Sequence, residues 1–128
     1  MNEPVWVPRD VIIAYHELLL AAHGGASGIR DTRMLDSALA RPENLFCYGD
    51  PTIFELAASY AFGLVKNYPF TDGNKRIGFA TSALFLELNG LQFVAPEVEV
   101  VLNTLALATG ELSESDYGNW LDSSSKSS

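Results

Sequence analysis

The chain has 128 residues, 48% of them hydrophobic, and its 16 Asp and Glu outweigh its 8 Lys and Arg to give a formal net charge of −8. This length predicts one domain over residues 1–128 with a sizeable core, and the composition excludes a disordered chain. An acidic chain lacks the broad basic surface on which nucleic-acid binding depends, so we expect no direct nucleic-acid binding.

Features of secreted and membrane proteins are absent from the sequence. Residues 1–4 do not begin a charged segment followed by an apolar one, so we expect no secretory signal. No apolar run reaches membrane-spanning length. The single cysteine, Cys47, excludes an internal disulfide, and His16, His23 and Cys47 show none of the usual metal-ligand spacings. We therefore expect a cytoplasmic protein that does not bind membranes.

Apolar residues at helical spacing predict a first helix over about residues 8–23, ended by two glycines. Its repeating residues are Val11, Ala14, Tyr15, Leu18 and Ala22. His16 and His23 lie near a face and an end of this helix, where histidines are most often structural.

Asp31 is a good N-cap for a short second helix over residues 32–40. We expect it to end at Arg41-Pro42, with these residues facing inward: Met34, Leu35, Ala38 and Leu39. The following segment, residues 45–51, is apolar and aromatic but is broken by glycine and proline, and no partner strand is obvious. Two interpretations remain: an exposed flap that carries Phe46 and Tyr48, or a loop packed on the core.

Thr52 caps a predicted third helix over residues 53–65, in which small residues such as Gly63 permit close helix contacts. A fourth helix over residues 77–88 is apolar almost all round, so we expect it to be the most buried element. A fifth helix over residues 96–109 retains some ambiguity with a strand, because Val94, Val98 and Val100 are β-branched.

Ser113, with Asp116 three residues later, opens a sixth helix. Residues 123–128 are expected to be a frayed tail, so that about residues 5–122 are ordered. The predicted fold class is therefore all-α, a compact bundle of about six helices in which a central loop leads into a buried central helix.

That central loop concentrates the polar chemistry of the chain. Residues 66–76 hold three of the eight basic residues and read Lys-Asn-Tyr-Pro-Phe-Thr-Asp-Gly-Asn-Lys-Arg. A glycine, free N–H groups at a helix N-terminus and cationic side chains together can bind phosphate. An ordinary loop with a solvated Lys-Arg pair is the alternative, and the residues alone leave both open.

If the loop binds a nucleotide, each of its polar residues has a role. Asp72 can hold a divalent cation beside a phosphate, and the backbone amides near Gly73 and Asn74 can bind phosphate oxygens. Lys75 and Arg76 can neutralise the charge that develops during transfer. Phosphoryl transfer also needs a general base, for which a histidine just before the loop would suit. Tyr68 stands there instead.

The stretch from Tyr68 to Arg76 resembles the signature of the Fic/Doc family, His-Pro-Phe-x-Asp-Gly-Asn-Lys-Arg in the Doc (death on curing) toxin branch. The similarity covers roughly residues 10–122. Further matching segments are residues 15–16, 24–25, 28–31, 38–42, 54–58 and 85–90. The six predicted helices agree with the Fic/Doc fold that the resemblance implies.

The resemblance implies a transferase that uses ATP and Mg²⁺. Fic enzymes that transfer AMP have a glycine at the position of Lys75 and a second arginine at the position of Phe79. Both departures match the Doc branch, which acts as a protein kinase that phosphorylates translation elongation factor Tu and so inhibits translation. Carried over, Asp72 would ligate magnesium. Gly73, Asn74, Lys75 and Arg76 would bind the phosphates.

The resemblance also implies supporting parts. Phe70 would be a buried anchor of the loop. The flap that positions the target segment would comprise Phe46, Cys47, Tyr48, Gly49 and Asp50. No convincing inhibitory segment is present in the chain, so control would come from a separate Phd-type antitoxin.

Tyr68 is the main departure from the family pattern. A phenol keeps its proton at neutral pH, and losing a general base costs on the order of 10²–10⁴ in rate. We therefore expect this chain to be inactive or severely impaired. Tyr68 is either natural or a change that removed the base of a toxic protein, and the otherwise intact motif favours the second. Alternative functions are an AMP transferase and a non-catalytic pseudoenzyme that binds nucleotide or protein.

Overall fold

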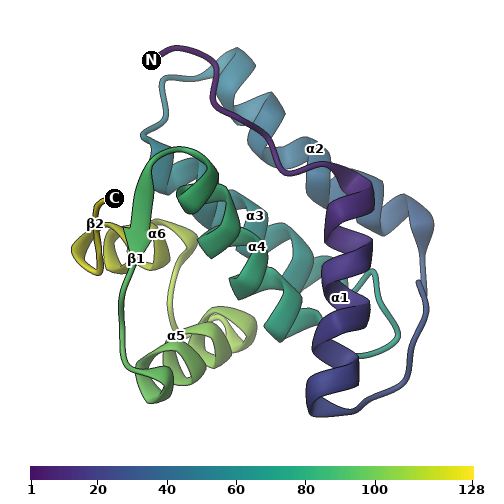
Figure 1. Ribbon diagram of the computed structural model, residues 1–128. Helices are drawn as coiled ribbons and strands as arrows, with labels where there is room; N and C mark the ends of the chain where they lie inside the picture. The colour runs from purple at the N-terminus through teal and green to yellow at the C-terminus, as the bar shows by residue number, and fades with distance from the viewer.

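The computed structural model describes residues 1–128, which form six helices and two short strands (Figure 1). In chain order these are α1 (Arg9–His23), α2 (Thr32–Tyr48), α3 (Ile53–Asn67), α4 (Asn74–Leu88), β1 (Leu91–Phe93), α5 (Glu97–Thr109), α6 (Glu114–Ser123) and β2 (Ser125–Ser127). The predicted all-α bundle of about six helices is confirmed, and the fifth segment is a helix. None of the helices is both long and apolar enough to span a membrane.

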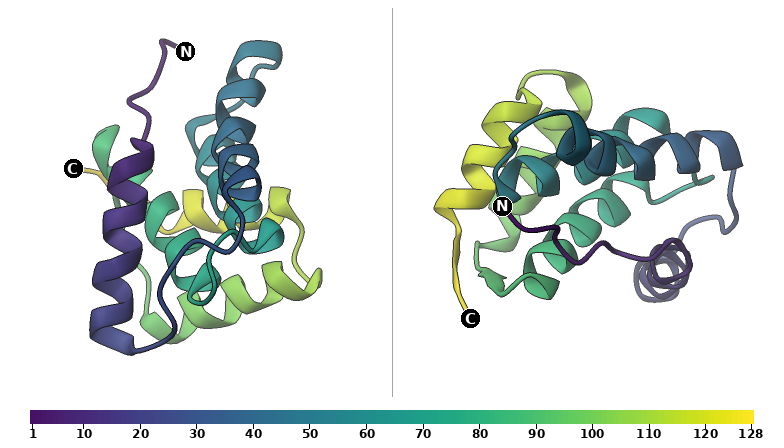
Figure 2. Two further views of the ribbon diagram at one scale, coloured as in Figure 1. Left: turned by 90° about the vertical axis from the view of Figure 1, so that its right-hand side faces the viewer. Right: turned by 90° about the horizontal axis from the view of Figure 1, so that it is seen from above.

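Helices α3 and α4 run through the middle of the molecule, with α1 on one side and α5 and α6 on the other (Figures 1 and 2). Small residues let the central helices approach closely. A Cβ atom on Gly63 would lie 3.1 Å from the Cα atom of Ala38 in α2, and one on Gly78 would lie 2.8 Å from a methyl group of Val65. The expected close contact at Gly63 is thus confirmed. The expectation that the fourth helix is the most buried element is wrong, because α3 is buried along its length as fully as α4.

The prediction that the second helix ends at Arg41-Pro42 is wrong, since α2 continues through Pro42 to Tyr48. Proline inside a helix loses one backbone hydrogen bond and costs about 3 kcal/mol. Here tertiary packing offsets that cost. Pro42 is buried, and Arg41 forms an ion pair with Glu114 of α6 (3.0 Å) and donates to the carbonyl O of Ser59 (3.3 Å).

The side-chain orientations expected for the first two helices are partly wrong. Met34 is 41% exposed rather than inward-facing, whereas Leu35 and Ala38 are buried as expected. In α1 the buried residues are Ile12, His16 and Leu20, none of which belongs to the repeating apolar set. The apolar pattern missed this face because a histidine occupies its centre.

The expected frayed tail is also wrong. β2 pairs antiparallel with β1, placing Leu91 opposite Ser127 and Phe93 opposite Ser125. The chain order β1, α5, α6, β2 joins residues 91–127 into one unit, which brings α5 back beside α4 (Figure 1). A polar three-residue strand has no hydrophobic period, so the sequence pattern could not reveal it.

Candidate functional site

The motif loop joins α3 to α4 through two residues in the left-handed region of backbone conformation. Tyr68 ends α3 with φ 51° and ψ 52°, and it is the one residue other than glycine with a positive φ. Gly73 precedes α4 with φ 77°. A left-handed conformation costs a residue with a side chain about 1–2 kcal/mol, so other contacts must hold Tyr68 in place.

Arg30 supplies those contacts from the segment between α1 and α2. Its Nε donates to the carbonyl O of Tyr68 at 2.6 Å, and its NH2 group donates to the carbonyl O of Asn67 at 3.0 Å. These carbonyls belong to the last turn of α3, where helix carbonyls lack partners and a cation is favourable. Arg30 therefore fixes the direction in which the loop leaves α3.

The same segment runs along the motif loop for several residues. Ile29 and Phe70 form an antiparallel bridge, and the N–H of Thr71 donates to the carbonyl O of Gly28 at 3.0 Å. Closer to α1 in the chain, the N–H of Ala26 donates to Oδ2 of Asp72 over 3.4 Å. Residues 24–31 are thus the segment that flanks the motif.

Phe70 anchors the loop, as predicted, and is 1% exposed. Its ring stacks on the imidazole of His16, with ring centroids 3.8 Å apart and planes 14° apart. Nε2 of His16 donates to the carbonyl O of Asp72 at 2.7 Å, while its buried Nδ1 makes no hydrogen bond and lies 3.9 Å from Oε1 of Glu17. His16 is accordingly a structural support beneath the loop.

The N-terminus of α4 presents unpaired donors. No side chain caps this helix, and the backbone N–H groups of Asn74, Lys75 and Arg76 donate to no atom of the chain. The N–H of Gly73 donates to Oδ1 of Asp72 at 2.8 Å. Free N–H groups at the positive end of a 15-residue helix are a favourable environment for an anion.

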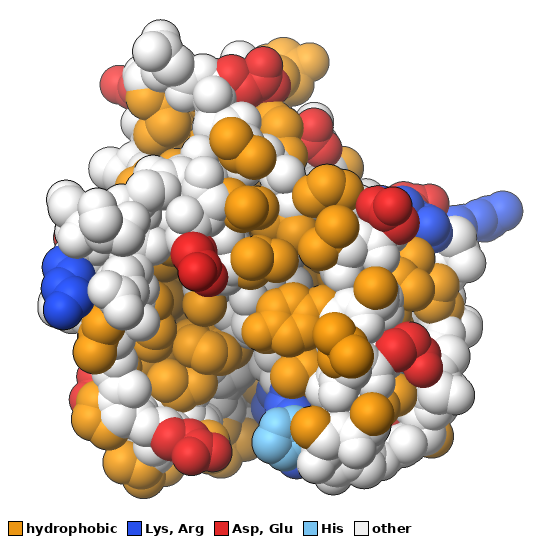
Figure 3. All heavy atoms as spheres, in the orientation of Figure 1, with side chains coloured by type: hydrophobic (Ala, Val, Ile, Leu, Met, Phe, Trp, Pro, Cys, Tyr) orange, Lys and Arg blue, Asp and Glu red, His pale blue; other side chains and the backbone are white.

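A cavity of about 630 Å³ opens at this helix end, between α1, α4 and α5. Figure 3 shows it as a hollow between α5 and α1 with apolar walls and cationic side chains at its base. Its lining residues are Tyr15, Leu19, His23, Tyr68, Thr71, Asp72, Gly73, Asn74, Lys75, Arg76, Phe79, Ala80, Ala83, Glu97, Val100, Val101, Thr104 and Leu105. Its size falls within the range of small-molecule sites.

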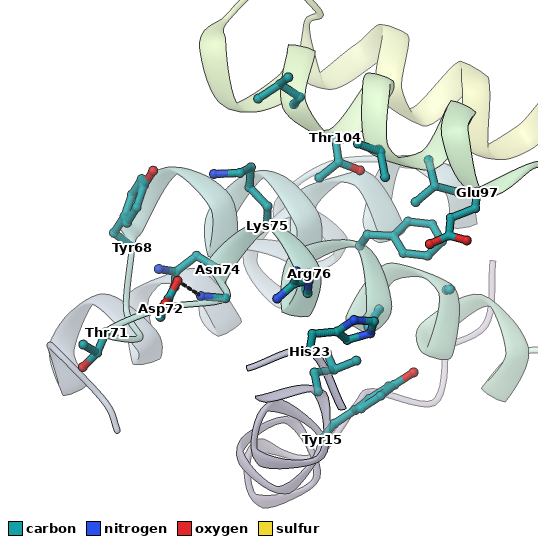
Figure 4. A pocket seen from close by; sticks show the side chains of 18 residues that line it. Tyr15, His23, Tyr68, Thr71, Asp72, Asn74, Lys75, Arg76, Glu97 and Thr104 are labelled. Carbon is teal, nitrogen blue, oxygen red and sulfur yellow. Dashed lines mark hydrogen bonds between the residues drawn. The ribbon is translucent and has the colours of Figure 1, made fainter. Parts of the chain in front are cut away.

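Six of the predicted site residues meet in this cavity: Tyr68, Asp72, Gly73, Asn74, Lys75 and Arg76. Lys75 and Arg76 are exposed and diverge, Lys75 toward Tyr68 and Arg76 toward His23 (Figure 4). The side chain of Asn74 is buried and bonded to Phe70, so its backbone N–H is what it can offer a ligand. No three His, Cys, Asp or Glu side chains gather to hold a metal ion.

The predicted flap is not a flap. Phe46, Cys47 and Tyr48 continue α2, and Gly49 and Asp50 lead into the N-terminus of α3, whereas the motif follows its C-terminus. None of the five lines the cavity. Phe46 instead packs edge-on against Trp6, with ring centroids 5.8 Å apart. The aromatic ring of Phe46 serves this packing, whereas Tyr48 is 89% exposed at the end of α2.

Sequence reasoning missed the wall that α5 contributes, which includes Glu97, Val101, Thr104 and Leu105. It also missed the place of Tyr15 and His23 in the cavity. No local signal identifies the α5 residues, because their position depends on how residues 91–127 fold back. The short Gly28-Ile29-Arg30 stretch was a usable signal, since it fits the Doc pattern and lies against the loop.

Comparisons with known proteins bear on this geometry. The model of the Fic/DOC family matches residues 6–86, which include the motif loop and most of α4 but not α5. A curated protein called Toxin Doc, from Mycolicibacterium smegmatis (strain ATCC 700084 / mc(2)155), is 38% identical over 76 residues. The matched stretch is 58% of this chain and 58% of that relative, less than two thirds of either.

Proposed function

This chain belongs to the Fic/Doc family, in its Doc branch, and on that premise we propose that it is the toxin of a toxin–antitoxin module. The reaction of its site would be transfer of the γ-phosphate of ATP to a hydroxyl of a translation factor of the elongation factor Tu type, in the cytoplasm. In the present chain Tyr68 suppresses that reaction.

One observation carries the proposal: three unpaired N–H groups at the start of α4 and two exposed cations border one cavity. Phosphoryl transfer relies on positioning and on stabilising negative charge, because the protein does little covalent chemistry itself. Lys75 and Arg76 extend from adjacent positions of α4 toward different parts of the cavity lining, Tyr68 and His23, so they can bind different phosphate oxygens of one triphosphate (Figure 4).

Asp72 fits a magnesium ligand that shares its ion with the nucleotide. Its carboxylate is exposed, lines the cavity and holds one short hydrogen bond, from the N–H of Gly73. With no other carboxylate or histidine gathered beside it, phosphate oxygens and water would complete the coordination. Bound magnesium would neutralise phosphate charge, and Asp72 would fix where it binds.

Phe79 argues against AMP transfer. It stands where AMP-transferring relatives have a second arginine, and its ring packs against Phe93 and Trp120, with centroids 5.3 and 6.4 Å away. An aromatic side chain in an aromatic cluster cannot pair with a phosphate. AMP transfer therefore remains an outcome of the test below rather than a second proposal.

The cavity also suggests where a Phd-type antitoxin would bind. Its α5 wall has exposed apolar residues, among them Val101 and Leu105, facing an α1 wall that includes Leu19. An amphipathic helix buries its apolar face in such a groove. Acidic residues on that helix would meet Lys75 and Arg76, so the antitoxin would cover the site it inhibits.

The test restores the base. Tyr68→His should arrest growth on induction, whereas the unchanged chain should not. The purified variant should transfer label from γ-labelled ATP, but not from α-labelled ATP, to elongation factor Tu. Tyr48→His is the matched control, because Tyr48 is exposed and lies outside the cavity. Normal growth together with no labelled factor would contradict the proposal.

A further inference from the structure

The five tyrosines of the chain occupy three different environments. Tyr60 and Tyr117 are buried in the core, and both of their hydroxyls are hydrogen-bonded. Tyr48 is 89% exposed at the end of α2, outside the cavity. Tyr15 and Tyr68 line the cavity, Tyr15 from α1 on the side of His23 and Tyr68 on the side of Lys75 (Figure 4).

Tyr68 is the one that lies beside the anion-binding groups. Its side chain is 51% exposed, and its hydroxyl makes no hydrogen bond within the chain. Lys75 extends toward it (Figure 4). Arg30 donates to the backbone carbonyl of Tyr68 at 2.6 Å, which fixes the direction in which the Cα–Cβ bond of Tyr68 leaves the loop.

A phenol reaches further from its Cα atom than an imidazole does. Tyr68 lines the cavity, so its phenol would occupy space that a histidine base would leave for the hydroxyl it deprotonates. The phenol oxygen of the chain itself would then stand where the hydroxyl of an external acceptor would otherwise be. We propose that Tyr68 is a phosphate acceptor, so that the chain phosphorylates its own Tyr68 from ATP; this inference rests on the proposed function of the cavity.

The step balances without a further reactant. The phenol oxygen bonds to the γ-phosphorus, and the bond from that phosphorus to the β–γ bridging oxygen breaks. ADP leaves, and the phenolic proton passes to solvent, which reaches the half-exposed side chain. Phosphoryl transfer has a loose transition state, so the proton need not leave before the new bond forms.

Magnitudes favour this reaction over transfer to another protein. Absence of a general base costs on the order of 10²–10⁴ in rate. A nucleophile held in place within the same molecule gains an effective concentration of up to about 10⁵–10⁸ M. An acceptor that is part of the cavity receives this gain without the binding of a second protein, so self-modification can proceed where transfer to an external hydroxyl is lost.

The product would remain in the site. Phosphotyrosine carries about 1.5–2 negative charges and three strong acceptor oxygens at neutral pH. Lys75, which extends toward Tyr68, and the unpaired N–H groups at the start of α4 would donate hydrogen bonds to these oxygens. A chain modified in this way has filled its own phosphate site, so we expect one turnover per chain and weaker binding of further nucleotide.

The experiment follows the intact mass of the purified chain. The chain is first treated with phosphatase, which is then removed, and is incubated with ATP and Mg²⁺; each phosphate adds about 80 Da. We expect the chain to gain one phosphate, which peptide sequencing maps to Tyr68. The modified chain should then bind nucleotide at least about tenfold more weakly. Tyr68→Phe keeps the ring and should gain nothing, whereas Tyr48→Phe should gain the phosphate normally.

Each other result overturns the inference. If the chain binds Mg–ATP but gains no mass, Tyr68 is not an acceptor and the proposed function still stands. If it neither binds nor gains mass, both fail. A phosphate on Tyr15, or one that persists in Tyr68→Phe, shows that another residue is the acceptor. An AMP group on Tyr68 shows that the site transfers a different part of ATP.

Discussion

The side-chain amide of Asn74 makes two hydrogen bonds to the backbone of one residue, Phe70. Oδ1 accepts from the N–H at 3.0 Å, and Nδ2 donates to the carbonyl O at 3.0 Å. Asn74 is the first residue of α4, and Phe70 is the buried anchor of the loop. The pair therefore joins the helix N-terminus to the loop, so that the free N–H groups and Asp72 keep fixed relative positions.

Replacing that amide should therefore cost both stability and binding. Asn74→Ala leaves a buried N–H and a buried carbonyl of Phe70 without partners, at about 1–3 kcal/mol each. We expect the free energy of unfolding to fall by about 2–4 kcal/mol in urea titration. Asn44→Ala, at an exposed position on α2, is the control and should change it by less than about 0.5 kcal/mol. Equal effects of the two variants would show that the pair is not structural.

Arg30 provides a second test of how the loop is held. Arg30→Ala removes two hydrogen bonds to the carbonyls of Asn67 and Tyr68, and bonds from a charged donor contribute about 1.5–3 kcal/mol. The donors that remain are water molecules, so we expect a loss of about 1–2 kcal/mol and faster hydrogen exchange at Thr71. Arg33→Ala removes a neighbouring exposed cation and should do neither. Unchanged hydrogen exchange at Thr71 would show that Arg30 does not hold the loop in place.

Stability should fall at high pH because of the two core tyrosines. Burial raises the pKa of Tyr60 to about 12 and also raises the pKa of Tyr117 above its ordinary value. An unfolded tyrosine ionises near pH 10. Above that pH the unfolded chain loses protons that the folded chain keeps, so the free energy of unfolding falls as pH rises.

This contribution is complete below about pH 10 and is lost as pH rises toward 12. Each tyrosine gives a slope of up to about 1.4 kcal/mol per pH unit. Urea titrations between pH 9 and about 11 measure the combined slope. Tyr60→Phe should roughly halve it, and Tyr48→Phe should leave it unchanged. A flat profile in the unchanged chain would refute the burial of both hydroxyls.

The sequence predicted what local patterns determine. Helix caps such as Asp31, Thr52 and Ser113 lie where they were expected, and each accepts a backbone hydrogen bond from the first turn. The motif at residues 68–76 was sufficient for the family, because its order of residue types is highly specific. The grouping of its polar residues at the start of α4 also follows from their closeness in the sequence.

Long-range packing decided the features that were missed. Pro42 stays helical because contacts of Arg41 with α3 and α6 outweigh a strong local signal. The pairing of β1 with β2 joins residues far apart in the chain, such as Leu91 with Ser127 and Phe93 with Ser125. The same pairing places α5 beside the motif, so the wall that α5 contributes to the cavity could not be predicted from local patterns.

The central claim is that the start of α4 binds the phosphates of a nucleotide, and calorimetric titration with Mg–ATP tests it most directly. The unchanged chain should bind, and the double variant Lys75→Ala, Arg76→Ala should bind at least about tenfold more weakly. The control Arg33→Ala, Lys126→Ala removes the same charge from exposed positions outside the cavity and should bind normally. Absence of binding, or equal affinity in both double variants, would contradict the claim.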